Sequence, residues 1–299
     1  MLSIFAEQVA PNESTVLIQG ESGTGKELLA RAVYNNSRRK NRPFLAVNCA
    51  ALPESLLESE LFGHEKGAFT GALAKKAGCF ELAHSGTLLF DEIAEMSMET
   101  QAKLLRAIET QKFRRLGGSE EVQVDVRMIA ATNKNIAAAL KAKELREDLY
   151  YRLSVVEIFI PPLRERKEDI GLLLDYFAQI YAAQYGRIAP RFSDETMDIL
   201  VSYDWPGNVR EVRNVVERAL VICTGDIIAP HVLPARVRTR VTPEGVISIP
   251  VGCSTQEAER ILILQTLASA GNNKAKAAKI LGVSRKTLHN KLNSFQQTL

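Results

Sequence analysis

A glycine-rich run near the start of the chain has the residue types and spacing of a phosphate-binding loop. It reads Gly20-Glu21-Ser22-Gly23-Thr24-Gly25-Lys26-Glu27 and stands between an apolar run and a helical pattern. Glycines let backbone N–H groups approach phosphate oxygens closely, and the N-terminus of the following helix adds a favourable dipole. Lys26 would supply positive charge to the terminal phosphates. The general motif has Ser or Thr where this chain has Glu27, so the run alone leaves a solvated glycine turn open.

A second run ends in two carboxylates. Gly86-Thr87-Leu88-Leu89-Phe90-Asp91-Glu92 is an apolar segment with the pattern of a buried strand. At the carboxyl end of such a strand, one acid can hold Mg²⁺ and the next can activate water. Acids also solvate strand ends, so this pair would say little by itself. Together with the glycine loop it indicates an NTPase.

The segments around these motifs predict the elements that position them. Apolar runs at residues 15–19, 44–48, 86–91 and 126–132 read as buried strands separated by helical patterns. Strands that alternate with helices imply a parallel sheet covered on both faces, and Pro161-Pro162 ends this region. From about residue 167 to 232 the pattern is helical throughout, with a helix start at Ser193. The predicted fold class is therefore α/β, followed by all-α parts.

Composition limits the class of protein. The chain has 299 residues, 46% hydrophobic and 24% charged, which excludes a mainly disordered chain. No run approaches the roughly 18 apolar residues of a membrane helix, so we expect a soluble cytoplasmic protein with no membrane contact. The cysteines Cys49, Cys79, Cys223 and Cys253 stand far apart. We expect free thiols rather than disulfides or a zinc site.

The last part of the chain has the charge and pattern of a DNA-binding module. Residues 251–299 hold seven Lys/Arg against two acids, whereas the preceding 250 residues hold 31 against 33. A helix over 274–281, a turn at Gly282 and a second helix capped by Ser284 predict a helix-turn-helix. A merely solvated basic helix is the alternative. The candidate DNA-binding residues are Ser284, Arg285, Lys286, Thr287, His289, Asn290 and Lys291.

Three further motifs give the chain a recognisable pattern. They are Glu60-Leu61-Phe62-Gly63-His64, Gly67-Ala68-Phe69-Thr70-Gly71-Ala72 and Trp205-Pro206-Gly207-Asn208-Val209-Arg210-Glu211. With the glycine loop, they resemble the sigma-54-dependent transcription activators, which are NtrC-type enhancer-binding proteins within the AAA+ ATPases. The resemblance covers essentially the whole chain. The hexapeptide 67–72 is its most specific part, since it is the family's contact element for sigma-54.

The resemblance assigns a role to each residue that matches a family motif. It implies ATP and Mg²⁺ as cofactors, with the phosphates bound by residues 20–27. In the family an acidic residue after the lysine is usual, so Glu27 fits it. Asp91 would hold Mg²⁺, Glu92 would polarise the attacking water, and Asn48 would hold that glutamate in an inactive pose. Asn133 and Arg210 would be sensors of the nucleotide. Arg146 and Arg152 would be arginine fingers that enter the site of a neighbouring subunit.

The same resemblance predicts the organisation of the chain and its partners. It implies an AAA+ α/β subdomain at 1–165, a helical lid at 166–233, a linker at 234–252 and a Fis-type helix-turn-helix domain at 253–299. A helix over 257–267 would serve dimerisation or the core of that domain. The implied partners are enhancer DNA, the sigma-54 RNA polymerase holoenzyme and other copies of the chain, from a dimer to a hexameric ring. Two-component regulation is implied as well.

Glycines on both sides of Phe69 predict a flexible tip that presents Phe69 and Thr70 to a partner, with a buried turn as the alternative. Residues 113–120 resemble a second surface loop that assists it. The implied activity is ATP-driven remodelling of the closed polymerase complex into the open complex. One rival is an AAA+ remodeller with another client, such as a helicase loader, and the intact hexapeptide argues against it. The other is a DNA binder whose ATPase has decayed, and Lys26, Asp91 and Glu92, with both arginines, argue against that.

Overall fold

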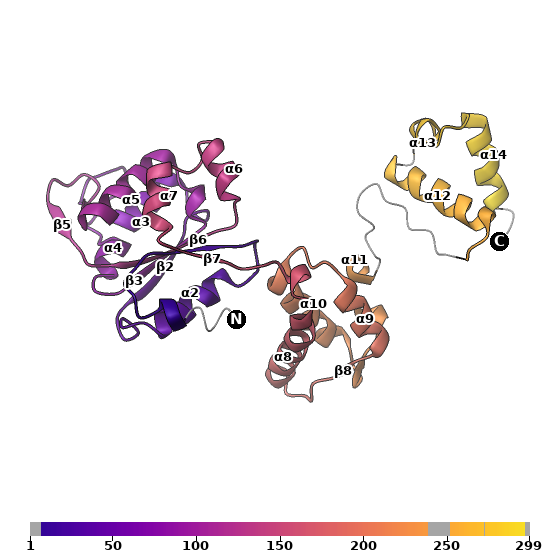
Figure 1. Cartoon of the computed structure of the whole chain (residues 1–299), viewed down its shortest axis with the longest axis horizontal. Coiled ribbons are helices and arrows are strands. Elements are labelled where there is room, and N and C mark those ends of the chain that lie inside the picture. The colour runs from indigo at the N-terminus through magenta and orange to yellow at the C-terminus, as the bar shows by residue number, and fades with distance from the viewer. Residues whose placement is uncertain (1–6, 239–251, 272, 297–299) are drawn as a thin grey trace. The chain divides into compact units, whose positions relative to one another are not determined.

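The computed structural model describes residues 7–238, 252–271 and 273–296, the last four of these by their backbone only. The chain separates into two compact units, residues 1–233 and 234–299 (Figure 1). The first unit contains an α/β part and a helical part. Among the described residues, the second contains one short helix followed by three longer ones.

A five-stranded parallel sheet forms the centre of the α/β part. Its order is β2-β3-β6-β1-β7. The strands are β1 (Val16–Gln19), β2 (Phe44–Asn48), β3 (Thr87–Asp91), β6 (Arg127–Thr132) and β7 (Val156–Phe159). The first four lie within one residue of the predicted runs, which confirms the predicted α/β class. The edge strand β7 was not predicted, because only Ile158 of its four residues is fully buried and its apolar run is weak.

Each face of the sheet is covered by helices, as alternating side chains of buried strands require. Leu88 and Phe90 pack with α3 (Glu54–Phe62), α5 (Met98–Thr110) and α7 (Glu147–Leu153). Leu89 faces the other way and packs with α2 (Lys26–Asn35). Figure 1 shows α2 on one side of the strands and α5 and α7 on the other. The short helices α4 (Cys79–Leu82) and α6 (Ile136–Lys141) complete this part.

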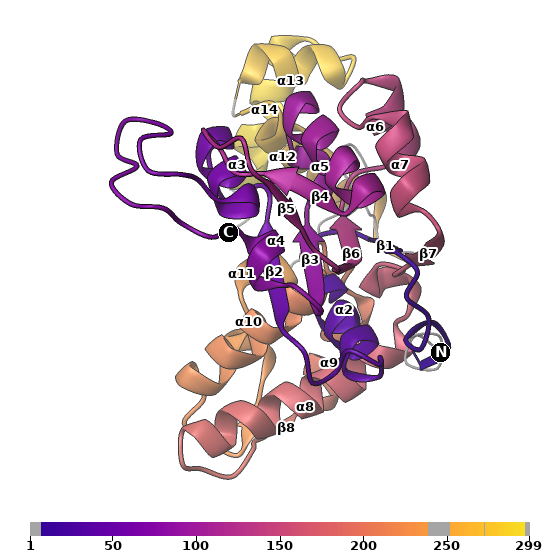
Figure 2. The ribbon, with the colours of Figure 1, turned by 90° about the vertical axis from the view of Figure 1, so that its left-hand side faces the viewer.

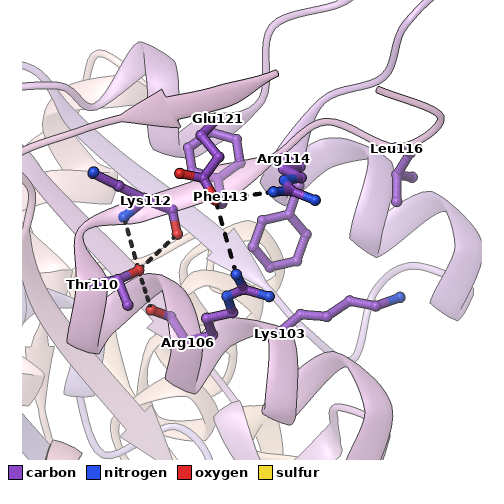
Figure 3. Close-up of a pocket in the computed structure, with 9 residues that line it drawn as sticks. Lys103, Arg106, Thr110, Lys112, Phe113, Arg114, Leu116 and Glu121 are labelled. Carbon is purple, nitrogen blue, oxygen red and sulfur yellow. Dashed lines mark hydrogen bonds and ion pairs between the residues drawn. The ribbon is translucent and has the colours of Figure 1, made fainter. Parts of the chain in front are cut away.

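A small antiparallel hairpin stands beside α5. It consists of β4 (Lys112–Arg114) and β5 (Glu121–Gln123), so the predicted surface loop at 113–120 is the tip of a hairpin with part of its strand β4. A cavity of about 430 Å³ lies between α5 and this hairpin (Figure 3). Phe113 backs the cavity, while Arg106 and Arg114 share the carboxylate of Glu121 at its rim.

The helical part of the first unit is built from α8 (Glu168–Gln184), α9 (Asp194–Ser202) and α10 (Asn208–Ile222). Ser193 caps α9 as predicted, since its Oγ accepts a hydrogen bond from the backbone N–H of Thr196 at 3.2 Å. A two-stranded pair, β8 (Arg191–Phe192) with β9 (Ile227–Ile228), interrupts the helical pattern and was not predicted. Each strand has two residues, too few for a period to show in sequence.

The second unit has the helices α12 (Thr255–Ser269), α13 (Lys274–Ile280) and α14 (Arg285–Gln296), after a short α11 (Ala235–Arg238). Its core contains Ile263, Ala277, Ala278 and Leu288, and the last three lie on the two helices of the predicted motif. Ser284 caps α14, because its Oγ accepts from the N–H of Thr287 at 3.0 Å. Most of the predicted linker at 234–252, with Arg240, Pro243, Gly245 and Pro250, lies outside the described residues.

Candidate nucleotide-binding site

The glycine loop leaves β1 at the carboxyl edge of the sheet and ends where α2 begins at Lys26. The N–H of Gly20 donates to the carbonyl of Thr132 at 3.2 Å, which ties the loop to β6. Gly23 and Gly25 have φ angles of 80° and 103°. Residues with a Cβ rarely adopt these angles, so glycine is required at both positions. The loop N–H groups and the helix N-terminus together suit an anion.

Lys26 is the cation of this site, and its side chain is only 6% exposed. Its Nζ donates to the carbonyls of Gly20 at 2.9 Å and Glu21 at 3.3 Å. It also lies 3.4 Å from Oε1 of Glu92. A buried cation needs such partners, and these contacts bring the lysine and the predicted water-activating glutamate together.

The two acids at the end of β3 have different surroundings. Glu92 is in the left-handed region with φ of 56°, and its Oε2 accepts from the backbone N–H of Asn133 at 2.9 Å. Asp91 lies beside Asn48, whose Nδ2 donates to Oδ2 of Asp91 at 3.4 Å. Burial, and then the negative charge of Glu92, raise the pKa of Asp91.

In this structure Asn48 bonds to Asp91, the neighbour of the glutamate to which the family resemblance relates it. The reason is the sheet register, because Asn48 pairs with Asp91 across β2 and β3. One residue later the backbone of Glu92 turns away into the left-handed region. Glu92 is held here by the backbone N–H of Asn133 and by its ion pair with Lys26.

The helical part reaches the glycine loop through the start of α10. Arg210 donates from Nη1 to the Oγ of Ser22 at 2.9 Å, and its N–H donates to the carbonyl of Gly23 at 3.3 Å. A Cβ at Gly23 would lie 2.4 Å from the carbonyl oxygen of Gly207. The predicted sensor Arg210 and the predicted loop residues are thus in direct contact.

Three residues at this junction were not among the predicted site residues. Arg164 forms two hydrogen bonds to the carboxylate of Glu21, at 2.9 and 2.6 Å. Its guanidinium is the main cause that lowers the pKa of Glu21. Arg166 donates to the carbonyl of Thr24, and the buried Asn208 donates to Glu21 and to the carbonyl of Ser22. Asn208 stands in a recognised motif, so a signal existed for it, but nothing in the sequence marks Arg164 or Arg166.

Arg146 and Arg152 lie away from this loop. Arg146 precedes α7 and forms two hydrogen bonds with Asp148, at 3.0 and 2.7 Å. Arg152 is exposed and lines a depression with Thr15 and Val126, which precede β1 and β6 at the amino edge of the sheet. Among the described residues neither guanidinium bonds to residues 20–27, which follow the carboxyl end of β1.

The hexapeptide forms a short turn, exposed at Phe69 and Thr70 and buried at Ala72, on the segment between α3 and α4, which extends away from the sheet (Figure 2). The N–H of Gly67 donates to the carbonyl of Ala72 at 2.9 Å, and that of Ala72 donates to the carbonyl of Phe69 at 3.0 Å. Phe69 is 40% exposed and meets the buried His64 edge-to-face, with ring centres 5.0 Å apart. Ala68 is half-buried, and Thr70 is exposed.

The base of this turn is joined to the β4–β5 hairpin. The N–H of Glu65 donates to the carbonyl of Leu116 at 3.0 Å, and the N–H of Leu116 donates to the carbonyl of Gly63 at 3.0 Å. Arg115 forms ion pairs with Glu65 and Glu81 at 3.0 and 2.5 Å. The hexapeptide and the hairpin are therefore connected at their bases.

In the second unit, the predicted DNA-binding residues lie on and just before α14. The exposed members are Ser284, Arg285, Lys286, Thr287, His289 and Asn290. Lys291 is half-buried and forms an ion pair with Glu259 of α12. The side chains that can donate hydrogen bonds to base edges and phosphate oxygens are those of Arg285, Lys286 and Asn290. None of the helices in the described ranges combines the length and apolar character needed to cross a bilayer.

These features define a P-loop domain with a helical lid, joined in one chain to a helix-turn-helix unit. Residues 2–159 match the sigma-54 interaction domain family, 164–246 the AAA+ ATPase lid domain and 255–295 the bacterial regulatory protein, Fis family. The chain is 50% identical over 290 residues to the transcriptional regulatory protein ZraR of Escherichia coli strain K12. It is 47% identical over 294 residues to the regulatory protein AtoC of the same strain. These alignments cover 95% and 96% of the chain and 64% of each relative.

A solved structure of another protein is similar to this chain in fold and sequence. NtrX from Brucella abortus, crystallised in complex with ADP, is similar over 98% of this chain and 66% of its own length, with a TM-score of 0.74 and 37% identity. The chain belongs to the family of sigma-54-dependent transcriptional activators, whose nucleotide-binding part is an AAA+ ATPase domain. It spans about two thirds of the length of these relatives.

Proposed function

We propose that this chain binds and hydrolyses ATP and uses the energy to convert the closed complex of sigma-54 RNA polymerase holoenzyme into the open complex. The observation that carries the proposal is the presence, in one unit, of a glycine loop with Lys26 and Glu92 and of an exposed hexapeptide turn. Family membership supports both parts.

The loop fits a nucleotide and its metal ion. The backbone N–H groups of residues 20–26 would bind the phosphates, and Lys26 would exchange its contacts with Gly20 and Glu92 for phosphate oxygens. Asp91 would hold Mg²⁺, since its carboxylate is a hard oxygen donor at a strand end. Bound Mg²⁺ neutralises charge that develops on the transferred phosphoryl group. Arg210 would reach the nucleotide from the lid side of the loop.

Glu92 is the residue that would orient and polarise the attacking water. Its carboxylate has one oxygen at Lys26 and the other at the N–H of Asn133. A γ-phosphate that draws Lys26 away leaves Glu92 held by Asn133, which then acts as a sensor. Asn48, bonded to Asp91, would act on the metal-binding acid in this arrangement.

Arg146 and Arg152 would complete the site of a neighbouring copy. Neither reaches the glycine loop of its own chain among the described residues. A planar and permanently charged guanidinium suits the charge that develops in phosphoryl transfer. The proposal therefore includes a homo-oligomer, from a dimer up to a hexameric ring.

The hexapeptide would transmit the nucleotide state to sigma-54. Its six residues are Gly67, Ala68, Phe69, Thr70, Gly71 and Ala72. Changes at Glu92 and Asn48 would move this turn together with the hairpin to which its base is joined. Phe69 and Thr70 are exposed at the tip, as a contact with a partner requires.

The helix-turn-helix unit would bind enhancer DNA through α14. The proposal includes a dimer through α12, on which the side chain of Leu264 is 43% exposed. For the whole chain we propose an AAA+ α/β subdomain at 1–165, a lid at 166–233, a linker at 234–252 and a DNA-binding domain at 253–299. With these partners the chain would act in the bacterial cytoplasm.

The test is open-complex formation by sigma-54 polymerase on supercoiled template, with the chain compared to its Thr70→Ala variant. We expect opening that requires hydrolysable ATP and falls about tenfold or more in the variant, while its ATPase activity changes less than about twofold. ATPase activity without any opening would point to another client protein. Absence of ATPase activity would reject the proposed enzyme.

A further inference from the structure

Gln101 is a fully buried polar residue on α5, with an exposed fraction of 0%. Its Nε2 donates to the carbonyl of Met96 at 2.9 Å and to the carbonyl of Glu144 at 2.8 Å. Its Oε1 accepts from the backbone N–H of Arg146 at 2.9 Å. Both amide hydrogens and the amide oxygen are therefore used, and no apolar side chain of this size can replace the three bonds.

The partners of Gln101 belong to two segments with separate roles. Met96 follows the short turn η1 (Ile93–Glu95), which begins directly after Glu92. Arg146 immediately precedes α7, and its guanidinium is oriented by Asp148. The amide of Gln101 thus joins the turn that follows Glu92 to the segment that carries Arg146.

Lys134 makes a second link between the same segments. Its Nζ donates to the carbonyl of Ala94 at 3.1 Å and pairs with Glu95 at 3.2 Å and Glu144 at 2.9 Å. It directly follows Asn133, whose N–H holds Glu92. One polar network therefore runs from Glu92 through its turn to the segment at 144–146.

We propose that Gln101 is a positioning residue for Arg146, assisted by Lys134, and that it fixes where each subunit presents this arginine to the active site of its neighbour. The inference rests on the trans role of Arg146 in the proposed function. The bond from the N–H of Arg146 sets the position of its backbone, from which the guanidinium must reach across the interface. In phosphoryl transfer a misplacement of about 1 Å can cost on the order of a hundredfold in rate.

The experiment uses oligomers mixed from two inactive variants of the whole chain. Glu92→Gln subunits keep Arg146 but do not hydrolyse ATP. Arg146→Ala subunits keep Glu92 but present no arginine. If the arginine acts in trans, the mixture regains ATPase activity at sites where an Arg146→Ala subunit faces a Glu92→Gln subunit.

Gln101→Met, which keeps the volume and removes the bonds, is then placed in one partner at a time. In the Glu92→Gln partner, which supplies the arginine, we expect the regained activity to fall about tenfold or more with the KM for ATP nearly unchanged. In the Arg146→Ala partner we expect a fall below about threefold, because that subunit supplies no arginine. Gln179→Met, at an exposed position of α8, is the matched control and leaves either mixture unchanged.

An equal fall in both partners, or a fall only in the Arg146→Ala partner, overturns the proposal, because Gln101 would then support only its own subunit. A mixture that regains no activity with Gln101 intact rejects the trans arrangement itself, and the inference with it. Unfolding temperatures of the Gln101→Met proteins close to those of their parents keep the comparison free of misfolding.

Discussion

Two glycine-rich loops of the α/β part have similar composition and opposite surroundings. In residues 20–27, Gly23 packs so closely on the lid that a Cβ would meet the carbonyl oxygen of Gly207 at 2.4 Å. In residues 67–72, Gly67 and Gly71 also have positive φ, but a Cβ at either would meet nothing within 4 Å. The first loop bonds to β6 and α10, whereas the second is held within itself and by His64.

The difference shows that glycine serves two purposes in this molecule. In the glycine loop it removes a side chain where two backbones must approach each other and leaves N–H groups directed at a ligand. In the hexapeptide it gives freedom to a turn that stands in solvent. A loop that is already ordered binds a small anion without the cost of ordering it. A loop that moves together with a bound partner needs conformational freedom instead.

The largest expected effect is a difference in ATP affinity between two variants, each of which adds one methyl group to one of the loops. Gly23→Ala combines a left-handed backbone with a clash against Gly207, so we expect ATP affinity to fall about a hundredfold. Gly71→Ala has the backbone cost alone, so we expect it to keep ATP affinity within about threefold. Titration calorimetry with ATP measures both. Equal losses would show that the packing on the lid has no bearing on nucleotide binding.

A smaller effect is expected where the hexapeptide is held to its base. His64→Ala removes the ring beneath Phe69 and the bond to Ser59, so it should lower the free energy of unfolding by about 1–3 kcal/mol. Because Phe69 is released, cleavage after it by chymotrypsin should become several-fold faster. His231→Ala, at an exposed position of the lid, is the control. Loss of stability without faster cleavage would mean that His64 is a core residue only.

The smallest effect is expected at the rim of the glycine loop, where Arg164 lowers the pKa of Glu21. A lowered carboxylate pKa stabilises the folded chain above the ordinary pKa of glutamate, and this contribution disappears as pH falls through the lowered pKa. The pair is 41% exposed on each side, so Glu21→Gln should cost about 0.5–1 kcal/mol at pH 7.

Thermal unfolding across pH measures this contribution. The curves of Glu21→Gln and the parent chain should converge in acid, since both then carry a neutral side chain at this position. A deficit that persists below the lowered pKa, where the side chain of Glu21 is neutral in the folded chain as well, would assign the effect to packing rather than charge.

Much of the site could be predicted because its residues follow one another in the chain. The glycine loop and Asp91-Glu92 each stand at the end of a buried strand, and parallel strands bring such ends to one edge of a sheet. The predicted runs matched β1, β2, β3 and β6 within one residue. Strand β7 at the edge escaped because half-buried strands lack a continuous apolar run.

The contacts that were missed depend on pairings between distant segments. Arg164 and Asn208 meet Glu21 across 143 and 187 residues of sequence, and no local pattern encodes that approach. Asn48 pairs with Asp91 rather than Glu92 because of the register of β2 on β3, a tertiary property. The family resemblance identified the residue types, while the geometry decided which of them touch.

The left-handed backbone of Glu92 has a consequence for how this site can evolve. A non-glycine residue at φ of 56° costs on the order of 1 kcal/mol, which glycine at the same position avoids. The backbone cost alone would favour glycine at position 92, and selection for the proposed role in hydrolysis would keep a glutamate there. In a lineage released from that selection, this position is expected to drift toward residues that make the protein more stable and inactive.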